Sequence, residues 1–196
     1  MSTPADNAWR ILETAEQLCS AVVVSAAVER LAREITVRLQ CGFPLVLGVM
    51  RGGVMFAGQL LPQLRFPLEF DYLDVTRYGD STRGGSIAWK GYPGTAVSGR
   101  TVLILDDILD EGKTLAAIRD RLLAAGALHV YSAVFAEKET GRPKPISADF
   151  VGVRLPNRYV FGFGMDVKGL WRNLPEIYAL KEGEECGENY PDQPLL

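Results

Sequence analysis

Short apolar runs alternate with stretches of helical periodicity along the chain. Residues 45–50, 101–105 and 130–136 are almost wholly apolar, which is typical of short buried strands. Residues 25–39 and 115–122 instead carry apolar side chains at intervals of three and four, which predicts helices packed by one face. The alternation of strand and helix predicts an α/β domain.

The remaining periodic segments extend this pattern toward both ends of the chain. Ser25 is the expected N-cap of the helix that begins there. Two further helices and three further strands are predicted: helices at residues 8–20 and 54–64, and strands at residues 68–75, 150–153 and 159–163.

Residues 78–99 interrupt the pattern with glycine, proline and polar side chains. A loop this long inside a compact domain is usually a functional one, so we expect a flexible loop here. Residues 181–196 are acidic and are expected to form a tail. We therefore expect a single domain over residues 1–180.

Composition narrows the class of protein. The 196 residues are 47% hydrophobic with a formal net charge of -3 and no basic run, so a general nucleic-acid binder is not expected. No stretch of about 18 apolar residues occurs, and we expect no membrane partner. Three scattered cysteines, Cys19, Cys41 and Cys186, favour neither a disulfide framework nor a zinc ribbon, so we expect a cytoplasmic protein.

The strand at residues 101–105 leads into the segment with the clearest chemistry. Two adjacent carboxylates, Asp106 and Asp107, follow the strand, where ligands of open α/β sheets bind. Gly112, Lys113 and Thr114 then open a helix, whose backbone N–H groups make an anion site. The carboxylates can bind hydroxyls or a metal, and the adjacent helix N-terminus can bind a phosphate. These are the two kinds of group that a ribose 5-phosphate presents.

This segment has two other possible interpretations. A nucleotide P-loop requires a glycine five residues before Gly112, and Asp107 stands at that position, so the P-loop is excluded. An ordinary cluster of carboxylates at a strand end, followed by a helix cap, stays open on these residues alone.

Residues 106–114, after an apolar strand, resemble the phosphoribosyl pyrophosphate motif of type I phosphoribosyltransferases. The segment Met50-Arg51-Gly52-Gly53 is similar to the family's pyrophosphate loop, and Arg77-Tyr78 to the start of its flexible catalytic loop. Lys138 and residues 149–172 resemble the base-binding half of the hypoxanthine-guanine branch. The resemblance implies a mostly parallel central sheet flanked by helices, with a small hood built from the chain ends.

The resemblance also implies an activity: transfer of the 5-phosphoribosyl group from phosphoribosyl pyrophosphate to hypoxanthine or guanine, with xanthine as a further candidate, in purine salvage. Asp110 is the expected catalytic residue, which takes a proton from the purine. The ribose and 5-phosphate are expected to contact Asp106, Asp107, Asp110, Glu111, Gly112, Lys113 and Thr114. Because the family more often has threonine or serine at Glu111, we expect that carboxylate to face solvent.

The other implied contacts lie outside this segment. Pyrophosphate is expected at Arg51, Gly52, Arg77, Tyr78 and Arg172, with a non-proline cis peptide between Met50 and Arg51. The purine is expected at Lys138, which would donate to its O6, and at Arg158, Tyr159, Val160 and Asp166. The expected cofactor is Mg²⁺, bound by Asp106, Asp107 and Asp166.

Two further functions compete with this one. A regulator that keeps the phosphoribosyl site and binds nucleic acid or protein would share the fold, but no basic patch supports it. A transferase for adenine or a pyrimidine is disfavoured by Lys138 and Asp166. The resemblance also implies a homodimer or homotetramer, to which the apolar residues 22–24 would contribute.

Overall fold

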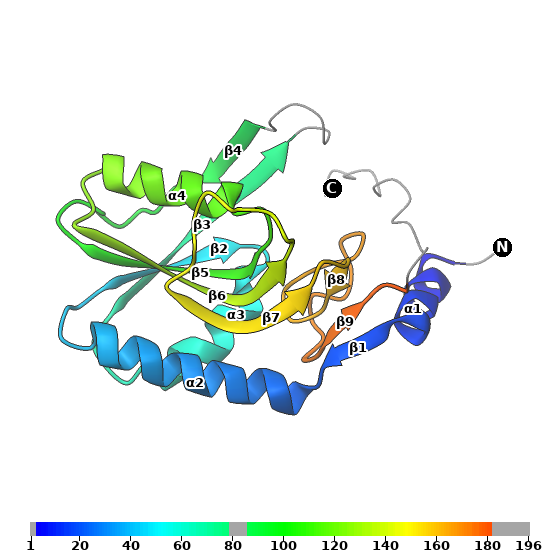
Figure 1. The fold of residues 1–196 in the computed structure, drawn as a ribbon. Coiled ribbons are helices and arrows are strands. Elements are labelled where there is room, and N and C mark those ends of the chain that lie inside the picture. Colours follow the sequence, from blue (N-terminus) through cyan, green and yellow to red (C-terminus); the bar gives the residue numbers. More distant parts are fainter. Residues whose placement is uncertain (1–2, 79–85, 182–196) are drawn as a thin grey trace.

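A twisted sheet forms the centre of the protein (Figure 1), whose computed structural model describes residues 3–78 and 86–181. Within these residues six strands pair in the order β4-β3-β2-β5-β6-β7. They are β2 (Leu45–Met50), β3 (Glu69–Tyr78), β4 (Ser86–Gly91), β5 (Thr101–Leu109), β6 (His129–Glu139) and β7 (Phe150–Pro156). All neighbours are parallel except β4, which is antiparallel to β3, so the predicted mostly parallel sheet is confirmed.

Helices cover both faces of this sheet. Helices α2 (Ala21–Leu39) and α3 (Gly53–Leu60), with the short 3-10 helix η1 (Leu61–Gln63), lie on one face, and α4 (Lys113–Ala124) lies on the other (Figure 1). Alternate side chains of β5 pack against the helices on opposite faces of the sheet. Leu103 and Leu105 pack with α2 and α3, and Val102 and Ile104 pack with α4. Burial of both faces explains why this strand is apolar without alternation.

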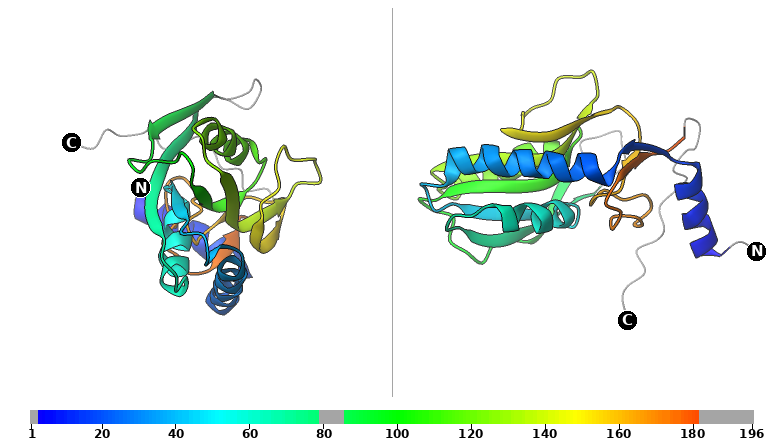
Figure 2. Two further views of the ribbon diagram at one scale, coloured as in Figure 1. Left: turned by 90° about the vertical axis from the view of Figure 1, so that its left-hand side faces the viewer. Right: turned by 90° about the horizontal axis from the view of Figure 1, so that it is seen from below.

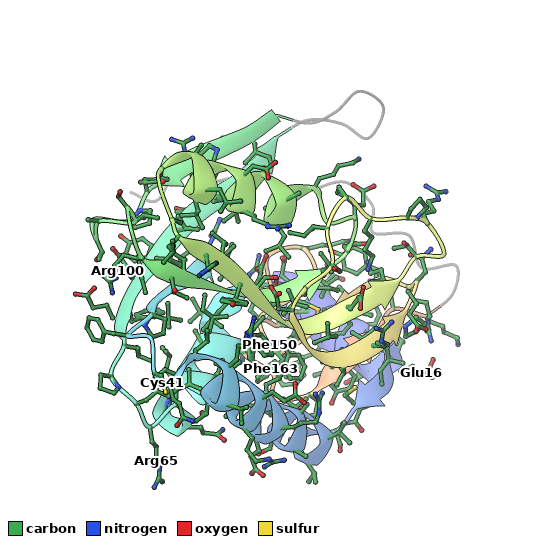
Figure 3. All side chains as sticks on the ribbon, turned by 60° about the vertical axis from the view of Figure 1, so that its left-hand side comes forward. Glu16, Cys41, Arg65, Arg100, Phe150 and Phe163 are labelled. Atoms are coloured by element: carbon green, nitrogen blue, oxygen red, sulfur yellow. The ribbon has the colours of Figure 1, made fainter. Side chains whose placement is uncertain are left out.

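A small hood lies beyond the carboxyl ends of the parallel strands (Figures 1 and 2). It consists of α1 (Pro4–Thr14) and an antiparallel sheet of β1 (Glu16–Cys19), β9 (Ile177–Ala179) and β8 (Val160–Phe161). Phe163, labelled in Figure 3, is fully buried. It joins the hood to the main core, because its ring centroid lies 4.3 Å from that of Phe135. The hood therefore combines the two ends of the described chain, as predicted.

The N-terminal helices differ from the prediction. Residues 8–20 were expected to form one helix, but α1 ends at Thr14 and β1 follows, because residues 16–19 pair with β9. The predicted N-cap Ser25 lies inside α2; the N-cap is Ser20, whose hydroxyl accepts a hydrogen bond from Val23 N at 3.4 Å. Periodicity within residues 8–20 could not reveal a strand whose partner lies about 160 residues away.

The predicted long loop at residues 78–99 is also corrected. Residues 86–91 form β4, whose Ile87 and Trp89 pack against the cluster beneath α4. Arg121 of α4 lies over the Trp89 ring at 4.3 Å, which fastens the strand to the helix. Residues 79–85 lie outside the described residues, as does the predicted acidic tail after residue 181. In the described ranges, no helix combines the length and apolar character needed to cross a bilayer.

Candidate active site

A cleft of about 340 Å³ opens where β2 and β5 end beneath the hood. Its walls come from the turn after β2, the segment from β5 into α4, the end of β3 and the hood residue Arg172. The lining residues are Val49, Met50, Arg51, Gly52, Asp74, Val75, residues 106–115 and Arg172. The cleft thus brings the predicted ribose and phosphate residues together with Arg51, Gly52 and Arg172.

The segment from β5 into α4 departs from the prediction at its start. The strand continues through both carboxylates to Leu109, because Ile108 and Leu109 still pair with β6. Gly112 then adopts φ +78° as the N-cap of α4, a left-handed conformation that favours glycine. Residues 111–115, at the start of α4, line the cleft, and the free N–H groups of a helix N-terminus stabilise an anion.

Asp106 and Asp107 form a pair of carboxylates at the base of the cleft. Burial raises the pKa of Asp106 well above its ordinary value, and the charge of Asp107 raises it further. Burial also raises the pKa of Asp107, although hydrogen bonds from the Asp106 side chain and Ile108 N and the charge of Arg172 oppose the increase. A cation bound beside this pair would remove the unfavourable charge.

The turn after β2 packs tightly against these carboxylates. The peptide bond between Met50 and Arg51 is cis, as the resemblance implied. A Cβ atom on Gly52 would lie 1.9 Å from Asp107 Oδ2, so no side chain fits there. On the other side, a Cβ atom on Gly164 of the hood would lie 2.1 Å from Gly52 O. The turn is therefore held between the sheet and the hood.

Arg172 and Asp166 form a second charged group on the hood side. Arg172 Nη2 lies 2.5 Å from Asp166 Oδ1, and its Nη1 donates to Gly164 O at 2.6 Å. Gly169 N donates to the other Asp166 oxygen at 2.6 Å. In the described part of the chain no three His, Cys, Asp or Glu side chains cluster as metal ligands. Asp166 is thus separate from the pair at residues 106 and 107.

Lys138, predicted at the purine, meets the predicted catalytic residue Asp110 at the ends of β5 and β6. Lys138 Nζ lies 2.6 Å from Asp110 Oδ2, and the lysine side chain is 13% exposed. The Tyr159 ring is partly exposed, and its hydroxyl donates to Asp166 O at 3.2 Å. This arrangement places one ammonium donor and one carboxylate acceptor side by side.

Comparison with known proteins decides the family. A model of the phosphoribosyl transferase domain matches residues 15–168. The chain belongs to the phosphoribosyltransferase family. Among curated relatives, it is 36% identical to a hypoxanthine-guanine phosphoribosyltransferase of Bacillus subtilis over 165 residues, covering 84% of this chain and 92% of that protein. It is 33% identical to one of Streptococcus pyogenes, covering 79% and 86%.

Solved structures agree with this assignment. A hypoxanthine phosphoribosyltransferase of Staphylococcus aureus superimposes with a TM-score of 0.82 at 27% identity, covering 88% of this chain and 95% of that one. A hypoxanthine-guanine-xanthine phosphoribosyltransferase gives a TM-score of 0.77 at 29% identity, covering 85% and 97%. The central sheet and hood are therefore those of this phosphoribosyltransferase family.

Not every predicted residue of this phosphoribosyltransferase reaches the cleft. Arg158 instead binds Glu16 and donates to Leu180 O at 2.8 Å, which ties together β1 and the end of the hood. Glu111 does line the cleft, but its side chain is about half exposed and pairs with Lys113 Nζ at 3.2 Å. Arg77 and Tyr78 end β3, and their side chains lie outside the described atoms.

Sequence analysis missed Gly164, although its backbone packs closely against Gly52 O in the turn that lines the cleft. It has φ +100° and accepts no Cβ atom. The repeated glycines at positions 162 and 164 were the signal, since closely spaced glycines often mark a close backbone approach.

Proposed function

We propose that this phosphoribosyltransferase acts in purine salvage. It transfers the 5-phosphoribosyl group from phosphoribosyl pyrophosphate to hypoxanthine or guanine and releases pyrophosphate. The pair of Asp110 and Lys138, 2.6 Å apart, carries the proposal. An oxopurine offers a carbonyl oxygen to an ammonium donor and a ring proton to a carboxylate, whereas adenine offers an amino group at the same position.

Asp110 accepts a proton from the imidazole part of the purine as the ring nitrogen bonds to C1 of the ribose. Lys138 donates to the exocyclic oxygen and orients the base. The Tyr159 ring and the Val160 backbone complete the base site. The C1–oxygen bond to pyrophosphate breaks in the same step, so the enzyme must hold both reactants in line.

The leaving pyrophosphate gathers negative charge as this bond breaks. Arg51, Gly52 and Arg172 line two sides of the cleft and would stabilise this charge, together with Arg77 and Tyr78 at the end of β3. The 5-phosphate binds at the N-terminus of α4, where Gly112, Lys113 and Thr114 contribute backbone N–H groups and a hydroxyl.

Mg²⁺ fits the carboxylates of this cleft. Asp106 and Asp107 are adjacent, poorly solvated and raised in pKa, which is a setting that a hard cation relieves. Two protein carboxylates are also what Mg²⁺ commonly accepts when substrate oxygens and water supply the rest. Asp166 would contribute to a second ion near pyrophosphate. When bound, Mg²⁺ would neutralise the charge on the pyrophosphate oxygens.

A panel of bases tests this function. With phosphoribosyl pyrophosphate and Mg²⁺, hypoxanthine and guanine should give IMP and GMP, xanthine should be measured beside them, and adenine should give little product. Release of pyrophosphate and formation of nucleotide are followed together. No nucleotide from any of the three oxopurines would reject the proposal.

The cellular location and the oligomeric state belong to the same proposal. We expect a cytoplasmic enzyme that assembles as a homodimer or homotetramer. Light scattering at several protein concentrations would show the assembly, and a monomer at all of them would contradict it.

A further inference from the structure

Lys144 lies in the loop after β6, between Pro143 and Pro145, and its side chain is only 12% exposed. Its ammonium has three protons, and three acceptors lie within reach. Nζ donates to Lys138 O at 2.7 Å, to Leu109 O at 3.1 Å and to Glu137 Oε1 at 3.3 Å. The hydrogen-bonding capacity of this ammonium is thus satisfied by protein atoms alone.

The acceptors lie at the point where two functional strands end. Leu109 directly precedes Asp110, and Lys138 supplies the other carbonyl itself. The register of β5 with β6 extends to the pair Leu109 and Glu137, so beyond it Asp110 is not held by that ladder. The Lys144 ammonium therefore links the two strands immediately next to the Asp110–Lys138 pair.

The backbone around Lys144 is restricted. Proline fixes φ at two flanking positions, which limits the freedom that the loop loses when it orders. The same segment also abuts the phosphate turn, because a Cβ atom on Gly112 would lie 3.3 Å from Pro145 Cδ and 3.4 Å from Lys144 Cβ. The loop is thus conformationally restricted, and the Lys144 side chain extends from it to the ends of β5 and β6.

We propose that Lys144 is a positioning residue for the base half of the site. It touches no substrate, and it acts by holding the backbone on either side of the Asp110–Lys138 pair. The inference rests on the proposed function, since the pair must bind and deprotonate a purine. If Lys144 only anchored its loop, its substitution would lower the stability of the fold. It would not change the kinetic constants for hypoxanthine and for phosphoribosyl pyrophosphate by different amounts.

Kinetics of Lys144→Met test this separation, because methionine matches the apolar stem of lysine and lacks the ammonium. Misplacing a reacting group can slow a reaction by about 100-fold, so kcat/KM for hypoxanthine should fall about 10- to 100-fold. KM for phosphoribosyl pyrophosphate should change less than about twofold, since the Pro145 contact with Gly112 remains. Lys144→Arg, which keeps a cation able to reach the carbonyls, should recover part of the loss.

Arg154→Met is the matched control. Arg154 also pairs with Glu137, at 3.4 Å, but its side chain is 65% exposed. Among the contacts of the described residues, it donates no hydrogen bond to the carbonyl of Leu109 or Lys138. It should leave both substrate constants within about twofold. Equal losses for hypoxanthine and phosphoribosyl pyrophosphate in Lys144→Met, or equal losses in the two variants, would overturn the proposal.

A second measurement does not depend on turnover. In ¹⁵N spectra of the folded protein, the Lys138 ammonium signal, assigned through Lys138→Arg, should shift or broaden in Lys144→Met and stay in place in Arg154→Met. An unchanged Lys138 signal in folded Lys144→Met would refute the positioning role even if the wild type turned over no oxopurine. If the wild type turned over no oxopurine but the Lys138 signal was displaced in Lys144→Met, the proposed function would be rejected. The positioning of Lys138 by Lys144 would still be supported.

Discussion

The two walls of the cleft are built in opposite ways. The sheet wall is continuous in sequence: β5, its two carboxylates, Asp110 and the phosphate turn occupy residues 101–114. The hood wall joins residues 3–19 to residues 158–181, and its geometry depends on contacts between them. The sheet wall, which is continuous in sequence, can carry the reacting groups on rigid elements. The hood wall, which is assembled from both ends of the chain, can adjust how the leaving group is held.

The walls also differ in what limits each one. At the sheet wall the dominant feature is electrostatic, because carboxylates are buried next to each other. At the hood wall it is steric, because Gly164 has no room for a Cβ atom against Gly52 O. Substitutions on the sheet wall should therefore change chemistry and pH dependence, and substitutions on the hood wall should change fit.

The largest effect is expected from Asp110→Asn. Loss of the proton acceptor should lower kcat about 10²- to 10⁴-fold with a much smaller change in the KM for either substrate. Steady-state rates with hypoxanthine measure it. Asp120→Asn on the exposed face of α4 is the control and should keep its rate. A loss that appeared wholly in KM would mean that Asp110 binds the base without moving its proton.

The sheet wall was largely predictable, because its signals are local. An apolar strand, two carboxylates and a glycine turn lie in one segment, and a buried strand must end near water. What failed was the end of β5: the sequence placed it before Asp106, but pairing with β6 extends it to Leu109. Polar residues usually indicate the end of a strand, but here the neighbouring β6 supplies the hydrogen bonds that extend β5.

Gly164→Ala should have the next largest effect, on the hood wall. The added methyl group would meet Gly52 O at 2.1 Å, so either the hood or the pyrophosphate turn must move. Overpacking of this kind should destabilise the fold by about 1–3 kcal/mol and raise KM for phosphoribosyl pyrophosphate.

Gly169→Ala separates this clash from backbone strain. Both glycines have positive φ, +100° and +79°, but a Cβ atom on Gly169 meets nothing within 4 Å. Chemical denaturation of the two variants should therefore show a larger loss for position 164. Equal losses would mean that backbone conformation, rather than contact between the walls, sets the cost.

The hood was predicted only in outline, because its contacts are non-local. Residues 16–19 have no sequence feature that names Ile177–Ala179 as their partner, so β1 was taken for part of a helix. The same reason explains Arg158, expected at the purine but bound to Glu16 from the other end of the chain. Roles that depend on distant partners need the folded structure.

Asp106→Asn should have a smaller effect, of opposite sign, on the metal-free protein. Because burial raises the pKa of Asp106 above its ordinary value near 3.8, the folded state binds its proton more readily than the unfolded chain does. The stability of the fold should therefore fall as the pH rises through the raised pKa, and the carboxylate penalty should be absent below pH 3.8.

Asparagine removes this penalty and should raise the free energy of unfolding at neutral pH by about 0.5–2 kcal/mol while lowering activity. Thermal unfolding with a chelator, between pH 4 and pH 8, measures both the gain and the lost pH dependence. Asp120→Asn is again the control, since an exposed carboxyl should give neither. A destabilised Asp106→Asn protein would show that the carboxylate is held by interactions that outweigh its burial.

The smallest effect is expected from Trp171→Phe, in the hood. Trp171 Nε1 donates to Ala8 O at 3.0 Å, and its ring meets that of Trp9 at 5.1 Å, so α1 contacts the residue next to Arg172. Phenylalanine keeps an aromatic ring and loses the hydrogen bond, which should destabilise the fold by about 0.5–1.5 kcal/mol. If α1 fixes Arg172 through this bond, KM for phosphoribosyl pyrophosphate should rise about two- to fivefold while KM for hypoxanthine stays constant.

Trp9→Phe keeps the ring contact and the Ala8 carbonyl, so it should leave both KM values unchanged. Comparison of the two variants therefore tests whether α1, at the other end of the chain, influences the binding of the leaving group. A rise in KM for hypoxanthine equal to that for phosphoribosyl pyrophosphate would place the effect on the whole hood. In that case the two walls would not divide the substrates between them, because loosening one wall would disturb the ligand of the other.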